Sequence, residues 1–269
     1  MSRIASKFEK LRAEGRKGFI PFITAGDPSI DASLKLALKL AELGADVIEL
    51  GVPFSDPMAD GPTIQRSSER AVAAGTRLVD VLECAAKIRE RSDIAIVLFS
   101  YLNPLLSFGI ENAAAAARDS GIDGILITDA IGREAREFSE IFGRNGIDLI
   151  SLIAPTTTDE RLLEICRSAN GFLYAVSRTG ITGGEGDWRT SAETLVKRAR
   201  RMTDLPIAVG FGIKDRDDVL SVWKYADAAV VGSAIVAAIE NSASGDETAA
   251  VESIVRSMLP EVANHDSKS

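Results

Sequence analysis

Short runs of apolar and β-branched residues alternate along the chain with longer segments in which apolar residues recur at helical spacing. Most of the short runs are apolar at every position, which is typical of parallel strands that are covered by helices. The runs comprise residues 18–24, 46–50, 94–100, 124–128, 147–153, 171–176, 206–210 and 228–232. They predict eight buried parallel strands.

The longer segments carry the apolar stripe of amphipathic helices; in residues 31–43, Leu34, Leu38 and Ala41 form the stripe. Several of them begin with Asp, Ser or Thr, whose side chains cap the exposed N–H groups at the start of a helix. The segments comprise residues 31–43, 78–91, 111–120, 133–145, 159–168, 191–202 and 215–225. They predict a helix between each strand and the next.

Eight strand–helix units that follow one another without a change in composition favour a closed (β/α)8 barrel over two open sheets. We therefore predict an α/β protein with a single TIM-barrel domain over residues 1–269. An extra N-terminal helix (residues 4–14) and a last helix (248–259) are additions, and the polar tail of about residues 262–269 is expected to be disordered. Active sites of such barrels lie at the C-terminal ends of the strands, so the candidate residues are sought there.

The overall composition excludes several classes of function. A formal net charge of −8 argues against a nucleic-acid surface, because phosphate backbones are bound by clustered Lys and Arg. No apolar run reaches the ~20 residues that a membrane span needs, and the charged N-terminal segment lacks the apolar centre of a signal peptide. A cytoplasmic protein that binds neither membranes nor nucleic acid is expected.

The single histidine, His265, lies in the polar tail, and the two cysteines, Cys84 and Cys166, lie in predicted helices, where we interpret them as reduced core thiols. This distribution leaves no Ser-His-Asp or Cys-His pair and no His/Cys cluster for zinc. No metal site is expected, and acid–base groups must come from Asp, Glu, Lys or Tyr.

An acidic residue, Glu49, interrupts the otherwise apolar second strand near its C-terminal end. Because side chains alternate along a strand, Glu49 shares its side with Val47. A carboxylate inside a barrel costs several kcal/mol unless it is paired, protonated or facing a wet site. A salt bridge to Lys or Arg is one interpretation; the position favours the other, an acid–base group with a raised pKa.

The loop that follows this strand, residues 51–62, is long and marked by prolines. Such a loop after a barrel strand is typical of a lid that carries a side chain to the substrate, and Asp60 is the candidate. The alternative is that Asp60 caps the helix that begins near Pro62.

Glycine-bearing turns follow the last three strands, at residues 177–184, 210–213 and 232–234. Phosphate sites in these barrels commonly use the loops after strands 7 and 8 and a helix N-terminus, where glycine allows close backbone approach. The Ser233 hydroxyl adds a donor. The turns therefore predict a phosphate site, and the alternative is tight connections without a ligand.

Residues 49–65 read ELGVPFSDPMADGPTIQ and closely resemble the signature of the tryptophan synthase alpha chain family. The resemblance covers nearly the whole chain and includes residues 21–28, 101–104, 177–183, 210–213 and 232–236. It implies a lyase of tryptophan biosynthesis that performs the retro-aldol cleavage of indole-3-glycerol phosphate to indole and glyceraldehyde 3-phosphate. A motif of this length is far more specific than a pair of glycines.

By this resemblance, Glu49 shuttles protons between the substrate hydroxyl and C3 of the indole, which suits a carboxyl with a pKa raised towards neutrality. Asp60 stays ionised, accepts the indole N–H hydrogen bond and stabilises the positive charge of the protonated ring. The resemblance also implies residues around the indole ring, a tyrosine that contacts the substrate, a loop residue that meets Asp60, and a phosphate cradle. The residues around the ring are Phe22, Phe99, Leu126, Ile153 and Phe211, and the tyrosine is Tyr174. The loop residue is Thr182, and the phosphate cradle consists of Gly183, Gly212, Gly232 and Ser233. The apolar members are equally consistent with ordinary barrel core.

The resemblance implies no metal or organic cofactor in this chain. Pyridoxal phosphate is expected only in the implied partner, the tryptophan synthase beta chain, with which the alpha chain would form an α2β2 heterotetramer. Pro53, Asp56, Asn103 and Pro104 match the surface that meets this partner.

Two loops depart from the family pattern. Residues 129–135, DAIGREA, lack the usual proline after the fourth strand, and residues 183–188, GGEGDW, are richer in glycine than usual. These changes leave both carboxylates in place and bear on loop closure and on the response to the partner.

Other functions remain open beside this one. A stand-alone indole-3-glycerol phosphate lyase would perform the same reaction without a partner. A non-catalytic regulatory subunit is disfavoured by the presence of both Glu49 and Asp60, and a sugar-phosphate isomerase would not explain residues 49–65.

Overall fold

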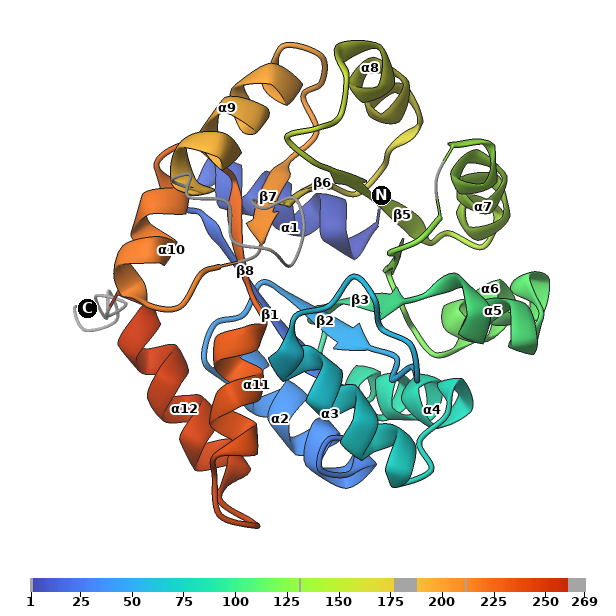
Figure 1. Ribbon diagram of the computed structural model, residues 1–269, viewed down its shortest axis with the longest axis vertical. Helices are drawn as coiled ribbons and strands as arrows, with labels where there is room; N and C mark the ends of the chain where they lie inside the picture. Colours follow the sequence, from blue (N-terminus) through green and yellow to red (C-terminus); the bar gives the residue numbers. More distant parts are fainter. Residues whose placement is uncertain (1, 131, 177–187, 211, 261–269) are drawn as a thin grey trace, which may run out of the picture.

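A closed barrel of parallel strands forms the centre of the molecule (Figure 1). The computed structural model describes residues 2–130, 132–176, 188–210 and 212–260. The strands pair in the order of the sequence, and β8 returns to β1. They are β1 (Gly18–Thr24), β2 (Val47–Gly51), β3 (Ala95–Ser100), β4 (Gly124–Ile127), β5 (Asp148–Ile153), β6 (Leu173–Val176), β7 (Ile207–Gly210) and β8 (Ala228–Val231). The predicted (β/α)8 architecture is confirmed.

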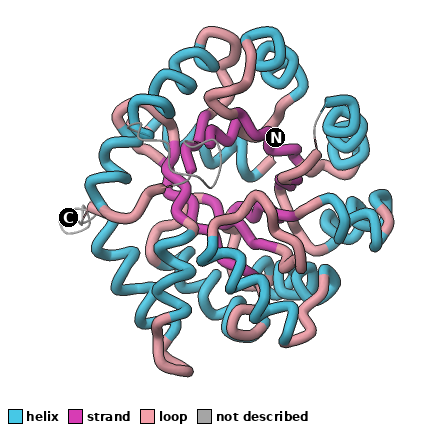
Figure 2. The backbone as a smooth tube through the Cα atoms, viewed as in Figure 1, coloured by secondary structure: helices cyan, strands magenta, loops and turns pink. Residues whose placement is uncertain are grey.

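Helices surround this barrel, as Figure 2 shows. They are α1 (Arg3–Ala13), α2 (Ile30–Glu42), α3 (Pro62–Ala73), α4 (Leu78–Arg89), α5 (Leu102–Phe108), α6 (Ile110–Asp119), α7 (Gly132–Arg144), α8 (Asp159–Ser168), α9 (Trp188–Arg200), α10 (Arg216–Trp223), α11 (Ser233–Glu240) and α12 (Glu247–Met258). All of the expected helices are present, with shifts at their ends. Helix α5 was not expected, because its seven residues are too few to show a helical period and include Pro104.

Side chains of α1 fill one end of the barrel. Ile4, Phe8 and Leu11 are buried and belong to the same cluster as inward-facing strand residues such as Val47. Gly124, at the start of β4, makes room for this helix, since a Cβ there would lie 2.7 Å from Cδ1 of Ile4. Helix α1 therefore closes the end at which the strands begin and leaves the opposite end for a binding site.

Aspartates at the starts of three strands tie each strand to a neighbour. The carboxylates of Asp46, Asp123 and Asp227 accept backbone N–H groups of Phe19, Ile96 and Ile207 at 3.0, 2.9 and 2.8 Å, respectively. Each aspartate also pairs with Lys or Arg side chains. These bonds satisfy strand N–H groups at the barrel rim, where an unpaired buried donor would be costly.

Replacing Asp123 with Ala is expected to lower the free energy of unfolding by about 3 kcal/mol, because it leaves Arg89 without its buried partner and the Ile96 N–H without an acceptor. Asp123 is 5% exposed and Arg89 15% exposed at their ion pair. Asp119→Ala is the matched control, because the Asp119–Arg118 pair is exposed at 68% and 54%. The control should change stability by no more than about 0.5 kcal/mol. Urea denaturation measures both changes, and equal effects would contradict the assignment.

Candidate active site

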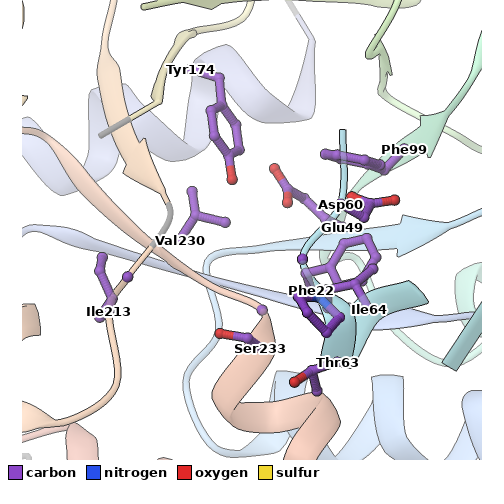
Figure 3. Close-up of a pocket in the computed structure, with 14 residues that line it drawn as sticks. Phe22, Glu49, Asp60, Thr63, Ile64, Phe99, Tyr174, Ile213, Val230 and Ser233 are labelled. Atoms are coloured by element: carbon purple, nitrogen blue, oxygen red, sulfur yellow. The ribbon is translucent and has the colours of Figure 1, made fainter. Parts of the chain in front are cut away.

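A cavity of about 850 Å³, including its part open to solvent, lies at the C-terminal end of the barrel. Residues from strand ends and from the loops after them line it, as expected for this architecture. They are Phe22, Glu49, Asp60, Gly61, Pro62, Thr63, Ile64, Phe99, Tyr174, Gly212, Ile213, Val230, Gly232 and Ser233. Figure 3 shows the side chains of Glu49 and Asp60 among these lining residues, with Phe22, Phe99 and Tyr174.

Glu49 faces this cavity from β2. The alternation along the strand places Val47 in the inner cluster and Ile48 and Leu50 in the outer one, so Glu49 points inward. Its side chain is 1% exposed, and neither carboxylate oxygen has a hydrogen-bond partner among the described residues. Burial raises the pKa of Glu49 from 4.5 to about 8. The alternative of a structural salt bridge is thus not found in the described part of the chain.

Asp60 is held by Tyr101, the residue after β3. The Tyr101 hydroxyl donates to Oδ2 of Asp60 at 3.0 Å and accepts the N–H of Ala59 at 2.9 Å. The Gln65 side chain donates to the backbone oxygen of Asp60 at 2.9 Å. Burial raises the pKa of Asp60 to about 6, and the bond from Tyr101 lowers it in part. The N-cap of α3 is Gly61, so the capping interpretation of Asp60 is wrong.

The two carboxylates thus occupy different environments in one cavity. At neutral pH, burial favours the protonated form of Glu49, whereas Asp60, with its hydrogen-bond donor, is ionised. One group is therefore available to donate a proton while the other supplies a negative charge.

Aromatic side chains form walls of the cavity. The rings of Phe22 and Phe99 meet edge to face with centroids 5.2 Å apart. Gly51 makes room for Phe22, because a Cβ there would lie 2.6 Å from Cζ of the ring. Tyr174 is 4% exposed, and its pKa is raised by burial and by the negative charges of the two carboxylates. These rings leave an apolar slot that suits a flat heteroaromatic group.

The hydroxyl of Tyr174 lies over the backbone of β7. A Cβ on Gly210 would come within 2.1 Å of this hydroxyl oxygen. Only glycine at this position allows the tyrosine side chain to reach into the cavity between the strands.

Another part of the cavity is suited to an anion. Gly232 is the N-cap of α11 and has no side chain to cap this end, and Ser233 is the first residue of the helix. Gly212, with φ of 82°, brings the backbone of the loop after β7 to the same cavity. Free N–H groups at a helix N-terminus, glycine backbone and a serine hydroxyl together form the kind of site that binds phosphate.

The comparisons with known proteins agree with this arrangement. The family model described as tryptophan synthase alpha chain matches residues 8–264. A tryptophan synthase alpha chain of Solibacter usitatus is 46% identical, over 97% of both chains, and one of Geobacter sulfurreducens is 45% identical, over 98% of this chain and 100% of the relative. The crystal structure of the alpha subunit from Legionella pneumophila str. Paris superposes with a TM-score of 0.88 at 36% identity, covering 96% of this chain and 97% of that one. This chain belongs to the tryptophan synthase alpha chain family.

Membership of the tryptophan synthase alpha chain family carries its reaction, the cleavage of indole-3-glycerol phosphate by a lyase in tryptophan biosynthesis. It also implies a tryptophan synthase beta chain as partner. The resemblance read from residues 49–65 is confirmed.

Some of the residues that the sequence predicted for the site line the cavity, and others do not. Eight of the described ones line the cavity: Glu49, Asp60, Phe22, Phe99, Tyr174, Gly212, Gly232 and Ser233. Leu126 is buried in the inner cluster and Ile153 in the outer one, and neither is among the lining residues. Thr182, Gly183 and Phe211 lie outside the described residues.

Several lining residues of this alpha chain were not predicted, among them Thr63, Ile64, Ile213 and Val230. Tyr101, the partner of Asp60, was also missed as a site residue. Its position directly after β3 is the available signal, because the same rule for strand ends applies to it.

The loop after β4, which lacks the usual proline, is held by its aspartate. Oδ1 of Asp129 accepts the N–H of Leu102, the first residue of α5, at 2.7 Å. This bond ties the loop to the residue that follows Tyr101. In the described part of the chain, no group of three His, Cys, Asp or Glu residues is placed to hold a metal ion, and no helix is long and apolar enough for a membrane span.

Proposed function

We propose that this alpha chain cleaves indole-3-glycerol phosphate in the described cavity, with Glu49 as the acid–base residue and Asp60 as the electrostatic stabiliser. The observation that carries the proposal is the pair of buried carboxylates, one without a hydrogen-bond partner among the described residues and one held by Tyr101, in a cavity that also contains the N-terminus of α11. Distinct environments for two carboxyls are how one site supplies an acid and an anion at the same pH.

The first step in this proposal is protonation of the indole ring. The carboxylic acid of Glu49 donates its proton to C3, and the ring nitrogen takes up the positive charge. The carboxylate of Asp60 accepts the N–H hydrogen bond and stabilises this cation, because a preplaced charge in a dry cavity acts strongly on a developing opposite charge.

The second step is cleavage of the carbon–carbon bond. The Glu49 carboxylate takes the proton of the hydroxyl on the carbon attached to the ring, and that carbon becomes the aldehyde. The electrons of the broken bond restore the double bond of the indole and remove its charge. Glu49 has then regained the proton that it donated, so one carboxyl completes the cycle.

The remaining predicted residues would orient the substrate. Phe22, Phe99 and Tyr174 would enclose the indole, and Gly212, Gly232 and Ser233 would bind the phosphate. The same assignment extends to Leu126, which is buried in the inner cluster, and to Thr182, Gly183 and Phe211 in the loops after β6 and β7; Ile153 belongs to the outer cluster and is not assigned to the ring. Holding both ends of the substrate supplies the orientation that this chemistry needs.

We further propose that the chain works in the cytoplasm without a cofactor of its own, in an α2β2 heterotetramer whose beta chain carries pyridoxal phosphate. Two features support a partner surface on the loops after β2 and β3. Met58 is 81% exposed and Leu106 in α5 is 54% exposed. Large exposed apolar side chains next to a lid are suited to burial in a protein interface.

An indole-release assay tests the proposed function. The purified chain, supplied with indole-3-glycerol phosphate, should release indole and glyceraldehyde 3-phosphate in equal amounts. Failure to release indole both alone and with a beta chain would overturn the proposal in favour of a non-catalytic regulatory subunit.

Adding the cognate beta chain is expected to raise indole release by at least about tenfold, because docking on the lid helps to close the site. Titration of the beta chain into the same assay measures the effect. Met58→Lys should keep the activity of the chain alone and lose much of this activation. Equal turnover with and without the beta chain would instead support a stand-alone lyase.

A further inference from the structure

Two neighbouring helices, α3 and α11, contribute their N-terminal residues to opposite ends of the proposed substrate site. Helix α3 begins at Pro62, two residues after Asp60, and Pro62, Thr63 and Ile64 in its first turn line the cavity. Helix α11 begins at Ser233, at the proposed phosphate end. The two helices pack side by side (Figure 1).

A network of ion pairs connects these helices behind the cavity. Arg70 of α3 binds Asp27 through two bonds, from Nε to Oδ1 at 2.8 Å and from Nη2 to Oδ2 at 2.7 Å. Its third nitrogen, Nη1, donates to Oε1 of Glu240 at the last turn of α11, at 2.8 Å. Arg66 binds the same Glu240 through two bonds of 2.7 Å.

The members of this network differ in exposure. The Asp27 side chain, in the loop between β1 and α2, is 2% exposed, Arg70 is 35% exposed and Glu240 is 21% exposed. Arg66, which pairs with Glu240, is 49% exposed. Paired, planar contacts of a guanidinium with carboxylates restrict geometry as well as supplying energy. Arg70 is therefore the member that fixes α3 to both the barrel loop and α11.

Two further contacts make α3 a rigid support for Asp60. The hydroxyls of Ser67 and Thr24 lie 2.6 Å apart in the buried space between α3 and β1. Gln65 binds the backbone oxygens of Asp60 and Pro57, at 2.9 and 3.3 Å. A shift of α3 would therefore move the loop that carries Asp60.

We propose that Arg70, oriented by Asp27, is a positioning residue that sets the separation between Asp60 and the phosphate end at Ser233 through its bond with Glu240. The proposal rests on the proposed function, because it takes the indole to lie at Asp60 and the phosphate at Ser233. Arg70 itself touches neither end of the substrate.

A ligand that occupies both ends gains from the second contact only when the spacing between the two subsites matches its length. Each half of the ligand by itself is insensitive to this spacing. A wrong spacing between the two subsites should therefore lower the affinity for the complete ligand and leave the affinities for its two fragments unchanged. General damage to the site would lower the affinities for the fragments as well.

Calorimetric titration with three probes distinguishes these outcomes: indole, glycerol 3-phosphate, and indole joined to phosphate by an unreactive three-carbon chain. Arg70→Gln and Glu240→Ala are expected to lower the affinity for the joined probe by about tenfold or more, while each fragment binds within about twofold of the wild type. The KM of the cleavage reaction should rise in parallel.

Arg66→Gln is the matched control, because it removes a charged contact to Glu240 and leaves the Asp27–Arg70–Glu240 chain in place. It should bind all three probes within about threefold of the wild type. Glu240→Ala keeps the buried Asp27–Arg70 pair, so it remains informative if Arg70→Gln does not fold.

Unchanged affinity of Glu240→Ala for the joined probe would overturn the positioning role, and so would an equal loss for the joined probe and the fragments. A wild-type chain that binds the joined probe no more tightly than the fragments would instead overturn the proposed function.

Discussion

Glu49→Gln is expected to lower indole release by more than about 10⁴-fold, because one residue performs two proton transfers and each is worth about 10²–10⁴. The amide that replaces the carboxyl has the same shape but neither donates nor accepts a proton at neutral pH. Turnover at saturating indole-3-glycerol phosphate measures the loss. Since the carboxyl is 1% exposed, the substitution by an amide of the same shape tests its chemistry with little change in packing.

The effect of Glu49→Gln on the stability of the fold is the control, and its direction follows from the pKa of Glu49. Burial raises the pKa of Glu49 from 4.5 to about 8, so the folded state holds this proton more tightly than the unfolded state. The contribution of Glu49 to stability is therefore greatest below pH 4.5 and is lost as the pH rises towards about 8. The Gln variant lacks this loss and should be at least as stable as the wild type at pH 8 in urea denaturation. Near-native turnover of a folded variant would refute the role of Glu49.

Asp60→Asn is expected to lower indole release by about 10³-fold, because it removes a preplaced negative charge from beside the cationic ring. Asparagine still accepts a hydrogen bond from the indole N–H, so substrate affinity should fall much less than turnover. Separate measurement of kcat and KM shows this difference. An Asn variant that loses affinity and keeps its kcat would contradict the electrostatic role.

The same assignment predicts a bell-shaped dependence of kcat/KM on pH. Activity needs ionised Asp60 and protonated Glu49, so it should rise through a pH of about 6 and fall above about 8. Tyr101→Phe removes a hydrogen bond that lowers the pKa of Asp60, so the acidic limb should move to higher pH. Asp60→Asn should remove this limb, and a limb that persists unchanged in that variant would assign it to another group.

The barrel and its two carboxylates were predictable from the sequence for physical reasons. Buried parallel strands are apolar on both faces, so the eight strands stand out from the amphipathic helices between them. Glu49 stands out because a carboxyl within such a strand is costly without a function. Asp60 was selected by its place in a long loop of the motif at residues 49–65.

The orientation of Ile153 could not be predicted from the sequence. Every position of β5 from Leu149 to Ile153 except Ser151 is apolar, so the sequence does not reveal which residues face inward. In the structure, Ile150 belongs to the inner cluster and Leu152 packs against it, while Leu149 and Ile153 belong to the outer one. A polar residue such as Glu49 marks the inward side of its strand, and β5 lacks such a mark at its C-terminal end.

Contacts between distant segments were also beyond the sequence. Tyr101 and Asp60 are separated by 41 positions, and Arg70 and Glu240 by 170. Neither pair follows from helix or strand periodicity, because each depends on how the barrel brings different loops and helices together. These contacts hold the carboxylate and the helices that carry the site.

The structure of the Glu49→Gln variant with indole-3-glycerol phosphate bound is the measurement that tests the central claim most directly, since this variant should hold the intact substrate. We expect the indole N–H within hydrogen-bond distance of Asp60, C3 and the adjacent hydroxyl facing residue 49, and the phosphate at Gly212, Gly232 and Ser233. A phosphate bound at another place, or an indole from which residues 49 and 60 both point away, would contradict the account.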